Sequence, residues 1–269
     1  MEMFKKTPFY IGLQDIVEAL HGYWLPCMLA WQDISIRYKR SRLGQFWLTI
    51  NTLIYISTLG IIFGSLFRFN LLEYLPNISA SVLMWNFMNA SITEGSMSFI
   101  SSENIILQVK LPFFTYIIRT LIRNFIAFCH NIVIFPFICL CVGYKINFYA
   151  FLSIFGLLIV FLNLSWICII AAVFCTRFRD LQQIIISIMQ ILFYVTPVVW
   201  SVKAFPPNFS PLMLTLNPFY NFINVVKMPL LGYAPAASEW MFCCGLAVVG
   251  WCAALYTLGK YKRRIAYWL

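Results

Sequence analysis

The strongest constraint in this sequence is a run at 46–67 that contains no charged side chain. In a helix, about 20 apolar residues cross the roughly 30 Å hydrocarbon core of a bilayer. Four cations, Arg37, Lys39, Arg40 and Arg42, come shortly before this run. Because the cytoplasmic flanks of membrane spans are rich in Lys and Arg, the run predicts a transmembrane helix that starts on the cytoplasmic side.

The composition of the whole chain agrees with a membrane protein. Hydrophobic residues make up 62% of the sequence and charged residues only 10%, whereas a soluble domain carries about 25% charged residues. The Lys and Arg residues that give the net charge of +10 lie beside apolar runs, so they indicate topology and lipid contact. We therefore expect no nucleic-acid partner. The nine cysteines lie mostly in apolar runs without histidine at ligand spacing, so we predict no metal site.

Six apolar segments, joined by short polar connections, predict an all-α protein with six transmembrane helices. The second segment contains Asn86, Asn89 and Glu94. A charge at mid-membrane is costly, so we expect Glu94 near the cytoplasmic end or inside the protein. With both termini cytoplasmic, 15 of the 19 Lys and Arg lie inside, which favours this topology. The predicted spans are 46–67, 78–100, 116–142, 149–175, 181–202 and 240–258.

The segment before the first span predicts a helix that lies in the membrane interface. Its apolar face carries two tryptophans, and Asp33 and Arg37 lie roughly opposite, four residues apart, where they can pair. The alternative is an ordinary anchor before the span. We place residues 1–45 in a cytoplasmic N-terminal segment and residues 46–269 in a six-span transmembrane domain. The apolar stripe is formed by Trp24, Met28, Trp31, Ile34 and Tyr38.

Polar and aromatic residues form a stripe on one face of the first span. Trp47, Asn51, Tyr55 and Thr58 share this face at helical spacing, together with Ser65. Polar groups are costly against lipid, so this face should contact protein or water. Elsewhere on the helix, Gly60 and Gly64 form a GxxxG pair that permits close helix packing.

The fifth span carries the clearest pattern in the chain. Six residues follow one another at steps of 4, 3, 4, 3 and 4, which places them on one helix face. One interpretation is a polar contact between packed helices; the other is the wall of a hydrated pathway, which the polar face of the first span favours. The six residues are Gln183, Ser187, Gln190, Tyr194, Pro197 and Ser201.

Residues 203–235 are apolar but broken by prolines, so we expect short re-entrant or interfacial helices there. In the third span, Arg119 and Arg123 can reach the headgroups from the cytoplasmic end. His130 lies deeper, and a lone histidine there is more often a packed hydrogen-bonding group than a proton relay.

Several motifs resemble those of the permease subunits of ABC-type polysaccharide exporters, which export O-antigen, capsule or teichoic acid. The resemblance covers nearly the whole chain and is specific for the family, not for one glycan. The motifs, in chain order, are DISIRYKRSRLGQFWLTINTLI, MWNFMNASITEG, ENIILQVKLPF, RFRD, FYVTPVVW and the NP of LNPFYNFI.

The resemblance implies a homodimer with two ATP-binding cassette subunits in the bacterial inner membrane. Its substrate would be a polysaccharide on an undecaprenyl-diphosphate lipid, and the first and fifth spans would line the channel. The chain has no GxxxxGK[ST] loop, so it is expected not to be an enzyme, and ATP and Mg would be bound by the partner ATPase.

This resemblance and the stripes together assign three groups of site residues. Phe193 and Trp200 lie off the main stripe of the fifth span but are aromatic candidates. The channel-lining candidates are Trp47, Asn51, Tyr55, Thr58, Gln183, Ser187, Gln190, Phe193, Tyr194, Pro197 and Trp200. The entry for the lipid diphosphate is assigned to Arg37, Lys39, Arg40 and Arg42, which could equally be topology signals only. The segment that couples to the ATPase contains Glu103, Asn104, Ile105, Gln108 and Lys110.

Three other functions remain open from the sequence. An ABC permease for drugs or small lipids would share much of the architecture. An ion-coupled transporter would use ionisable groups at the midplane, for which only Glu94 and His130 are candidates. A membrane glycosyltransferase or other lipid enzyme would need clustered carboxylates, whereas the nine acidic residues are scattered singly.

Overall fold

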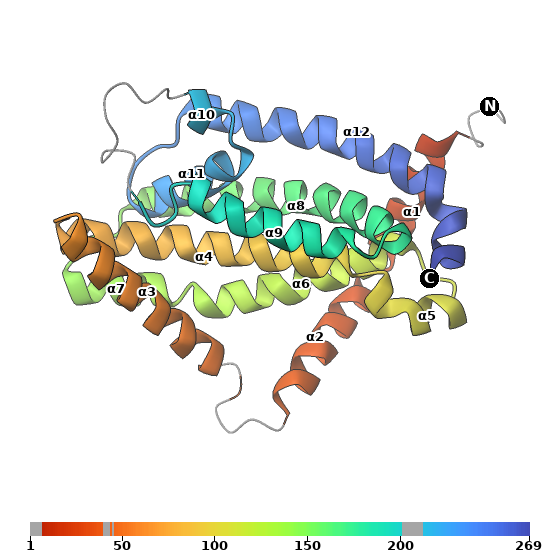
Figure 1. Ribbon diagram of the computed structural model, residues 1–269, viewed down its shortest axis with the longest axis horizontal. Helices are drawn as coiled ribbons and strands as arrows, with labels where there is room; N and C mark the ends of the chain where they lie inside the picture. The colour runs from red at the N-terminus through yellow and green to blue at the C-terminus, as the bar shows by residue number, and fades with distance from the viewer. Residues whose placement is uncertain (1–6, 40–43, 45, 201–211) are drawn as a thin grey trace.

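The computed structural model describes residues 7–39, 44 and 46–200 together with 212–269, and the regular elements in these ranges are all helices. Helices α4, α6, α8, α9 and α12 run along the length of the molecule, whereas α2 and α3 diverge from this bundle (Figure 1). Two short 3-10 turns, η2 (Ile100–Ser102) and η3 (Phe148–Phe151), precede α5 and α8. The helices are α1 (Pro8–His21), α2 (Trp24–Tyr38), α3 (Phe46–Leu66), α4 (Leu71–Ser96), α5 (Glu103–Gln108), α6 (Phe113–Asn131), α7 (Ile134–Val142), α8 (Leu152–Arg177), α9 (Leu181–Val195), α10 (Leu212–Thr215), α11 (Pro218–Leu230) and α12 (Ala237–Trp268).

Helix α4 lies at the centre of the bundle, and α3, α6, α7, α8, α9 and α11 all pack against it. Most of its residues are buried, including the polar side chains of Ser79, Ser81 and Ser91. These serines are therefore covered by protein, whereas Asn86, Asn89 and Glu94 of the same helix are half-buried. A helix in this position does not need a lipid-compatible surface of its own.

Four helical segments of the described chain are long and apolar enough to cross a membrane: 46–66, 113–142, 148–177 and 237–268. Helix α4 is not among them, and α9, with 15 residues, is shorter than the 18 residues or more of these segments. The structure therefore supports a membrane protein with several spans. The count of six, and the side on which the termini lie, stay predictions.

Two prolines shorten helices that the sequence predicts to be longer. The third predicted span is divided into α6 and α7, because Pro136 has no backbone N–H to donate to the carbonyl of Ile132. The fifth predicted span ends at Val195 instead of Val202. Thr196 is extended, with ψ at 136°, which is the conformation that the following Pro197 favours.

Glycines allow several helices to approach closely. A Cβ on Gly12 or Gly259 would collide with the backbone of the facing helix, where α1 lies against α12. A Cβ on Gly156 would lie 2.2 Å from the carbonyl oxygen of Val225, where α8 meets α11. The predicted close packing at the GxxxG pair is confirmed: its glycines are buried and face side chains of α4.

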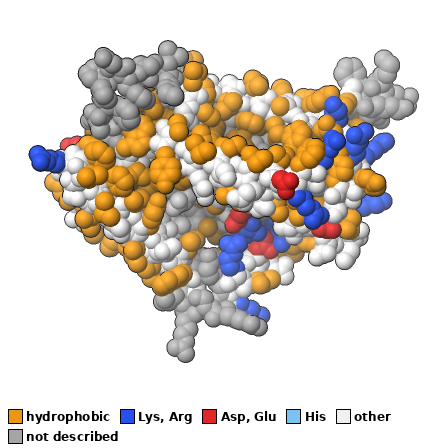
Figure 2. All heavy atoms as spheres, in the orientation of Figure 1, with side chains coloured by type: hydrophobic (Ala, Val, Ile, Leu, Met, Phe, Trp, Pro, Cys, Tyr) orange, Lys and Arg blue, Asp and Glu red, His pale blue; other side chains and the backbone are white. Residues whose placement is uncertain are grey.

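One end of the bundle brings together α1, α5 and the C-terminal end of α12 (Figure 1). Lys and Arg side chains gather over this end, while much of the bundle surface in view is apolar (Figure 2). Helices α10 and α11 cover the described part of the segment predicted to hold short helices, and nine of the 13 residues of α11 are buried. Residues 203–211 of that segment lie outside the described residues.

Candidate functional site

The polar stripe of the first span is uncovered within the chain. Trp47, Asn51, Tyr55 and Thr58 are all exposed, whereas the opposite face of α3 packs on α4 through its glycines. Ser65 is exposed too, although its hydroxyl donates to the carbonyl of Ile62 in its own helix. In a bilayer this face would meet lipid unless a second molecule or water covers it.

The stripe of α9 is also uncovered. Gln183, Ser187, Gln190 and Tyr194 are exposed and occupy a sector about 60° wide at 100° per residue. The adjoining sector is exposed as well, but it is wholly apolar: Ile184, Ile188, Ile191 and Val195. Helix α9 therefore presents two different surfaces beside each other, one suited to lipid and one suited to water or to a polar ligand.

One aromatic residue of each stripe lies within electrostatic range of the other. The hydroxyl of Tyr55 on α3 lies within electrostatic range of that of Tyr194 on α9. These two residues are 139 positions apart in the sequence, so only the fold brings them together.

The other channel candidates in and after α9 are more buried than its polar stripe. Phe193 is half-buried, and its ring packs against Trp85 of α4, with the centroids 5.5 Å apart. Pro197 is buried beyond the end of α9 and does not continue the stripe as predicted, because the helix has already ended. Trp200 is half-buried, and its indole N–H donates to the carbonyl of Tyr194. Ser201 lies outside the described residues.

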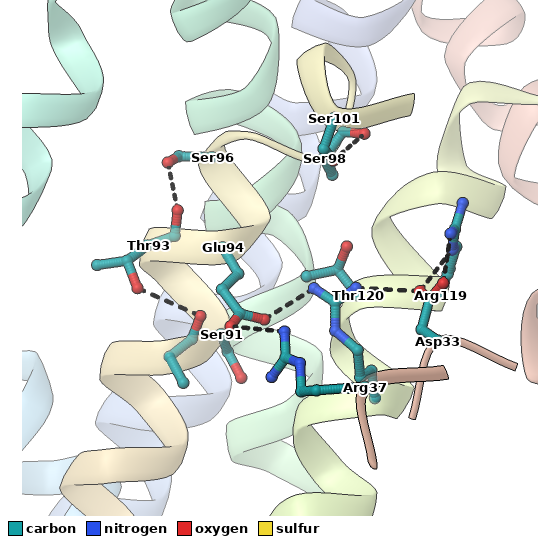
Figure 3. Close-up of polar contacts among 12 residues, drawn as sticks. Asp33, Arg37, Ser91, Thr93, Glu94, Ser96, Ser98, Ser101, Arg119 and Thr120 are labelled. Atoms are coloured by element: carbon teal, nitrogen blue, oxygen red, sulfur yellow. Dashed lines mark hydrogen bonds and ion pairs between the residues drawn. The ribbon is translucent and has the colours of Figure 1, made fainter. Parts of the chain in front are cut away.

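A network of five charged side chains joins α2 to the bundle (Figure 3). Arg119 donates to both carboxylate oxygens of Asp33, at 2.8 and 2.6 Å. Arg123 donates to Asp33 at 3.0 Å and to Glu94 at 2.8 Å, and Arg37 lies 3.9 Å from Glu94. We call these residues the α2 clamp.

The clamp corrects two expectations from the sequence. Asp33 is bound by Arg119 and Arg123 of α6, not by Arg37 four residues along its own helix. The same two arginines do not extend towards headgroups, because bound carboxylates hold them inside the protein. Glu94 is half-buried, with 34% of its side chain exposed, and it pairs with Arg123, so this candidate for an ion-coupled transporter already has a cationic partner.

Electrostatics keeps the Asp33 carboxyl of the clamp ionised. Burial raises the pKa of the Asp33 carboxyl, but the hydrogen bond from Arg119 and the charges of Arg119 and Arg123 lower it by more. The net pKa of Asp33 is therefore below its ordinary value of 3.8. Asp33 is a carboxylate at neutral pH.

The expected entry residues are only partly described. The side chain of Arg37 is 56% exposed, and Lys39 is exposed next to it. Arg40 and Arg42 lie outside the described residues. The apolar stripe of α2 is exposed at Trp24, Met28 and Trp31, but Ile34 is buried against the bundle.

The predicted coupling segment forms α5 at the same end of the molecule as α1 and the C-terminal end of α12 (Figure 1). Asn104, Gln108 and Lys110 are exposed, and Glu103 and Ile105 are half-buried. Leu107 and Val109 also present apolar surface there. This exposed end can receive a partner.

Sequence reasoning missed the residues that hold this segment in place. Asp15 of α1 is fully buried and accepts hydrogen bonds from the backbone N–H groups of Phe113 and Phe114 at the start of α6. Lys262 of α12 donates to the same carboxylate at 2.8 Å. The sequence held one sign that this face of residues 8–21 is buried: the small residues Gly12 and Ala19 lie on it.

Comparison with known proteins identifies the family. The O-antigen export system permease protein RfbA of Klebsiella pneumoniae is 25% identical over 203 residues, covering 71% of this chain and 74% of that protein. The protein of the same name from Myxococcus xanthus is 22% identical over 212 residues, covering 78% and 81%. A family model described as ABC-2 type transporter matches residues 27–231. This chain therefore belongs to the ABC-2 type transporter family, whose members are membrane transport subunits that act with an ATP-binding cassette partner.

Proposed function

We propose that this chain is the permease half of an ATP-driven exporter that moves lipid-linked polysaccharide, such as O-antigen or capsule, across the bacterial inner membrane. The observation that carries the proposal is the pair of exposed polar faces on α3 and α9. The relatives that carry an O-antigen export name support the choice of cargo.

The exposed polar faces favour a homodimer. A stripe with Asn51, Gln183 and Gln190 costs free energy against lipid tails, and the single chain leaves it uncovered. A second copy that placed its own α3 and α9 opposite would enclose a polar space and leave the apolar sector of α9 for lipid. The partner ATPases would bind ATP and Mg at the end that carries α5.

The chemistry of the stripes suits a sugar polymer. Aromatic rings such as Trp47, Tyr55 and Tyr194 stack against the C–H faces of sugars, while amides exchange hydrogen bonds with hydroxyls. Each contact is weak and of a kind that every sugar unit can repeat, so a chain can advance without a deep energy minimum. Arg37, Lys39, Arg40 and Arg42 would meet the diphosphate at the cytoplasmic entry.

The test is the double substitution Gln190→Leu and Tyr194→Leu in the complete transporter. Glycan export is measured as surface polysaccharide, and assembly as co-purification of the permease with its ATPase. The matched control is Ile188→Leu with Ile191→Leu, which alters the apolar sector of the same helix at nearly constant volume. We expect export to fall at least tenfold in the first variant alone, with assembly intact in both.

Two results would contradict the proposal. Normal export by the variant that lacks Gln190 and Tyr194 would show that the stripe is not part of the path. Equal losses in that variant and in the control would show that α9 is sensitive to packing in general.

A further inference from the structure

The C-terminal end of α12 contacts two segments that lie far apart in the sequence. Lys262 donates to the Asp15 carboxylate at 2.8 Å, and the same carboxylate accepts hydrogen bonds from the first two backbone N–H groups of α6. Six positions later, the ring centroid of Trp268 lies 5.5 Å from Cζ of Arg177, the last residue of α8. One helix end therefore touches a group bound to the start of α6 and also the end of α8.

The first contact holds the base of the predicted coupling segment. Helix α5 lies between η2 and α6, and the two ends of this loop meet where the rings of Phe99 and Phe113 pack edge to face, with centroids 5.4 Å apart. Phe99 and Asp15 are both fully buried. A buried carboxylate that lost its partners would be strongly unfavourable, so the base of this loop, Asp15 and Lys262 should move as one unit.

The second contact holds the turn before α9. Cζ of Arg177 also lies 5.0 Å from the ring centroid of Phe178, so the guanidinium contacts the rings of Phe178 and Trp268 at distances where cation–π attraction operates. The carbonyl of Phe178 accepts a hydrogen bond of 3.1 Å from the N–H of Leu181, the first residue of α9. The position of Trp268 therefore bears on where α9 begins.

Helices α12 and α9 differ in how firmly they are held. Helix α12 packs along α8 and α1, and it approaches α1 so closely at Gly12 and Gly259 that neither glycine has room for a Cβ. In α9, only Met189 of the 15 described residues is buried. Coupling between distant sites is carried by charge networks, packed side chains and rigid elements. Here α12 supplies the rigid element, and α9 has little buried surface to resist a shift.

We propose that Lys262 and Trp268 pass movements of the coupling segment to α9, and we call these two residues the α12 link. The inference rests on the proposed function, in which the ATPase meets the end that carries α5 and α9 lines the path. Lys262 acts through Asp15, and Trp268 acts through Arg177, so both are positioning residues that contact neither ATP nor glycan. The link gives a movement at α5 a route to the polar stripe of α9.

The experiment asks whether ATP still changes the surroundings of α9 when the link is cut. The complete permease is reconstituted with its partner ATPase in nanodiscs, in a background without reactive native cysteines. Gln183→Cys, at an exposed position near the start of α9, is modified by a water-soluble maleimide with and without ATP. Co-purification with the ATPase, ATP hydrolysis and the glycan exported per ATP are measured beside it.

Two substitutions cut the link at its two contacts. Trp268→Ala removes the cation–π contact, and Lys262→Met removes the ion pair while keeping a long side chain. Trp268→Phe and Lys262→Arg are the conservative counterparts, which keep a ring and a charge. The matched control is Tyr267→Ala, which removes the neighbouring ring, because that side chain is 89% exposed.

We expect ATP to change the rate of Gln183→Cys modification about fivefold or more in the wild type and in the control, and less than about twofold in Trp268→Ala and Lys262→Met, since coupling between sites is typically fivefold or larger. Both variants should still co-purify with the ATPase and hydrolyse ATP, while the glycan exported per ATP falls. The conservative counterparts should restore the ATP response and the export.

An ATP response that persists in Trp268→Ala, an equal loss in Tyr267→Ala, or no response in the wild type would overturn the inference. Loss of co-purification in Trp268→Ala would overturn it too, by assigning this residue to ATPase docking. If Lys262→Met does not assemble, Trp268→Ala decides alone, because the charge that Trp268 contacts, Arg177, is exposed.

The labelling contains no glycan, which separates this inference from the proposed function. An ATP response that depends on Trp268, in a chain that exports no polysaccharide, contradicts the proposed cargo alone. Normal export with a response that does not depend on Trp268 contradicts the link alone.

Discussion

The substitution Asp33→Asn tests how the diverging helix α2 is held against the bundle. Asp33 is the shared acceptor for Arg119 and Arg123, and all three side chains are about one-fifth exposed. Asparagine keeps the shape and one acceptor oxygen but removes the negative charge. Two arginines would then remain partly buried with Glu94 as their only carboxylate neighbour in the clamp.

The expected cost is about 2–3 kcal/mol of unfolding free energy. Breaking a fully buried ion pair costs about 3–5 kcal/mol, whereas an exposed pair contributes about 0–1 kcal/mol. With about four-fifths of each side chain buried, the clamp falls between these limits, nearer the upper one. The α2 helix should lose more protection than the rest of the chain, because no other described carboxylate of α2 replaces Asp33.

The assay is equilibrium unfolding in mixed detergent micelles, with hydrogen exchange to locate the change and Gln32→Ala on the same helix as control. A double-mutant cycle with Arg119→Gln isolates the pair, and we expect a coupling energy of about 1–3 kcal/mol. A change in unfolding free energy below about 0.5 kcal/mol for Asp33→Asn, or strictly additive single effects, would refute the clamp.

Three further predictions concern packing, capping and pH. Gly156→Ala should destabilise the chain by about 1–3 kcal/mol in the same unfolding assay, because the added Cβ collides with backbone atoms. Gly245→Ala, whose Cβ would point into open space, should be neutral or stabilising. Equal effects of the two substitutions would contradict this prediction. Asp15→Asn should lower the unfolding free energy by about 2 kcal/mol and speed hydrogen exchange at the Phe113 amide, because a buried charge at the start of a helix is lost. Unchanged exchange at Phe113 would contradict this prediction. Because the pKa of Asp33 is lowered on folding, its stabilising effect is complete above pH 3.8 and is lost as pH falls through the lowered value. The unfolding free energies of wild type and Asp33→Asn should therefore differ by the same amount from pH 5 to 8. A difference that became smaller within that range would contradict this prediction.

The parts of the fold that depend on local periodicity could be predicted from the sequence. The stripes of α3 and α9 repeat at helical spacing, and each lies on one face of its helix, where the single chain leaves Asn51 and Gln190 exposed. The early end of α9 could also have been predicted, because a residue before proline avoids the helical conformation. The spacing of Pro197 matched the stripe by number, but the chain is no longer helical there.

Tertiary partners could not be predicted in this way. Asp33 has a plausible partner four residues along its helix, yet it binds Arg119, which is 86 positions away. Nothing local indicates that choice, because it depends on how α2 lies against α6. The burial of Asp15 has the same origin: it needs the backbone of α6 and the Lys262 side chain of α12 at one point.

The most direct measurement of the central claim is cysteine labelling along α3 and α9 in the assembled transporter, in a background without reactive native cysteines. Asn51→Cys and Gln190→Cys report the polar stripes, and Ile54→Cys and Ile191→Cys report the neighbouring exposed apolar positions. We expect a membrane-impermeant maleimide to modify the first pair, to do so more slowly when lipid-linked glycan is present, and to leave the second pair unmodified. Failure to label Asn51→Cys and Gln190→Cys in every nucleotide state would show that these faces contact lipid or protein, and no polar path would then run along them.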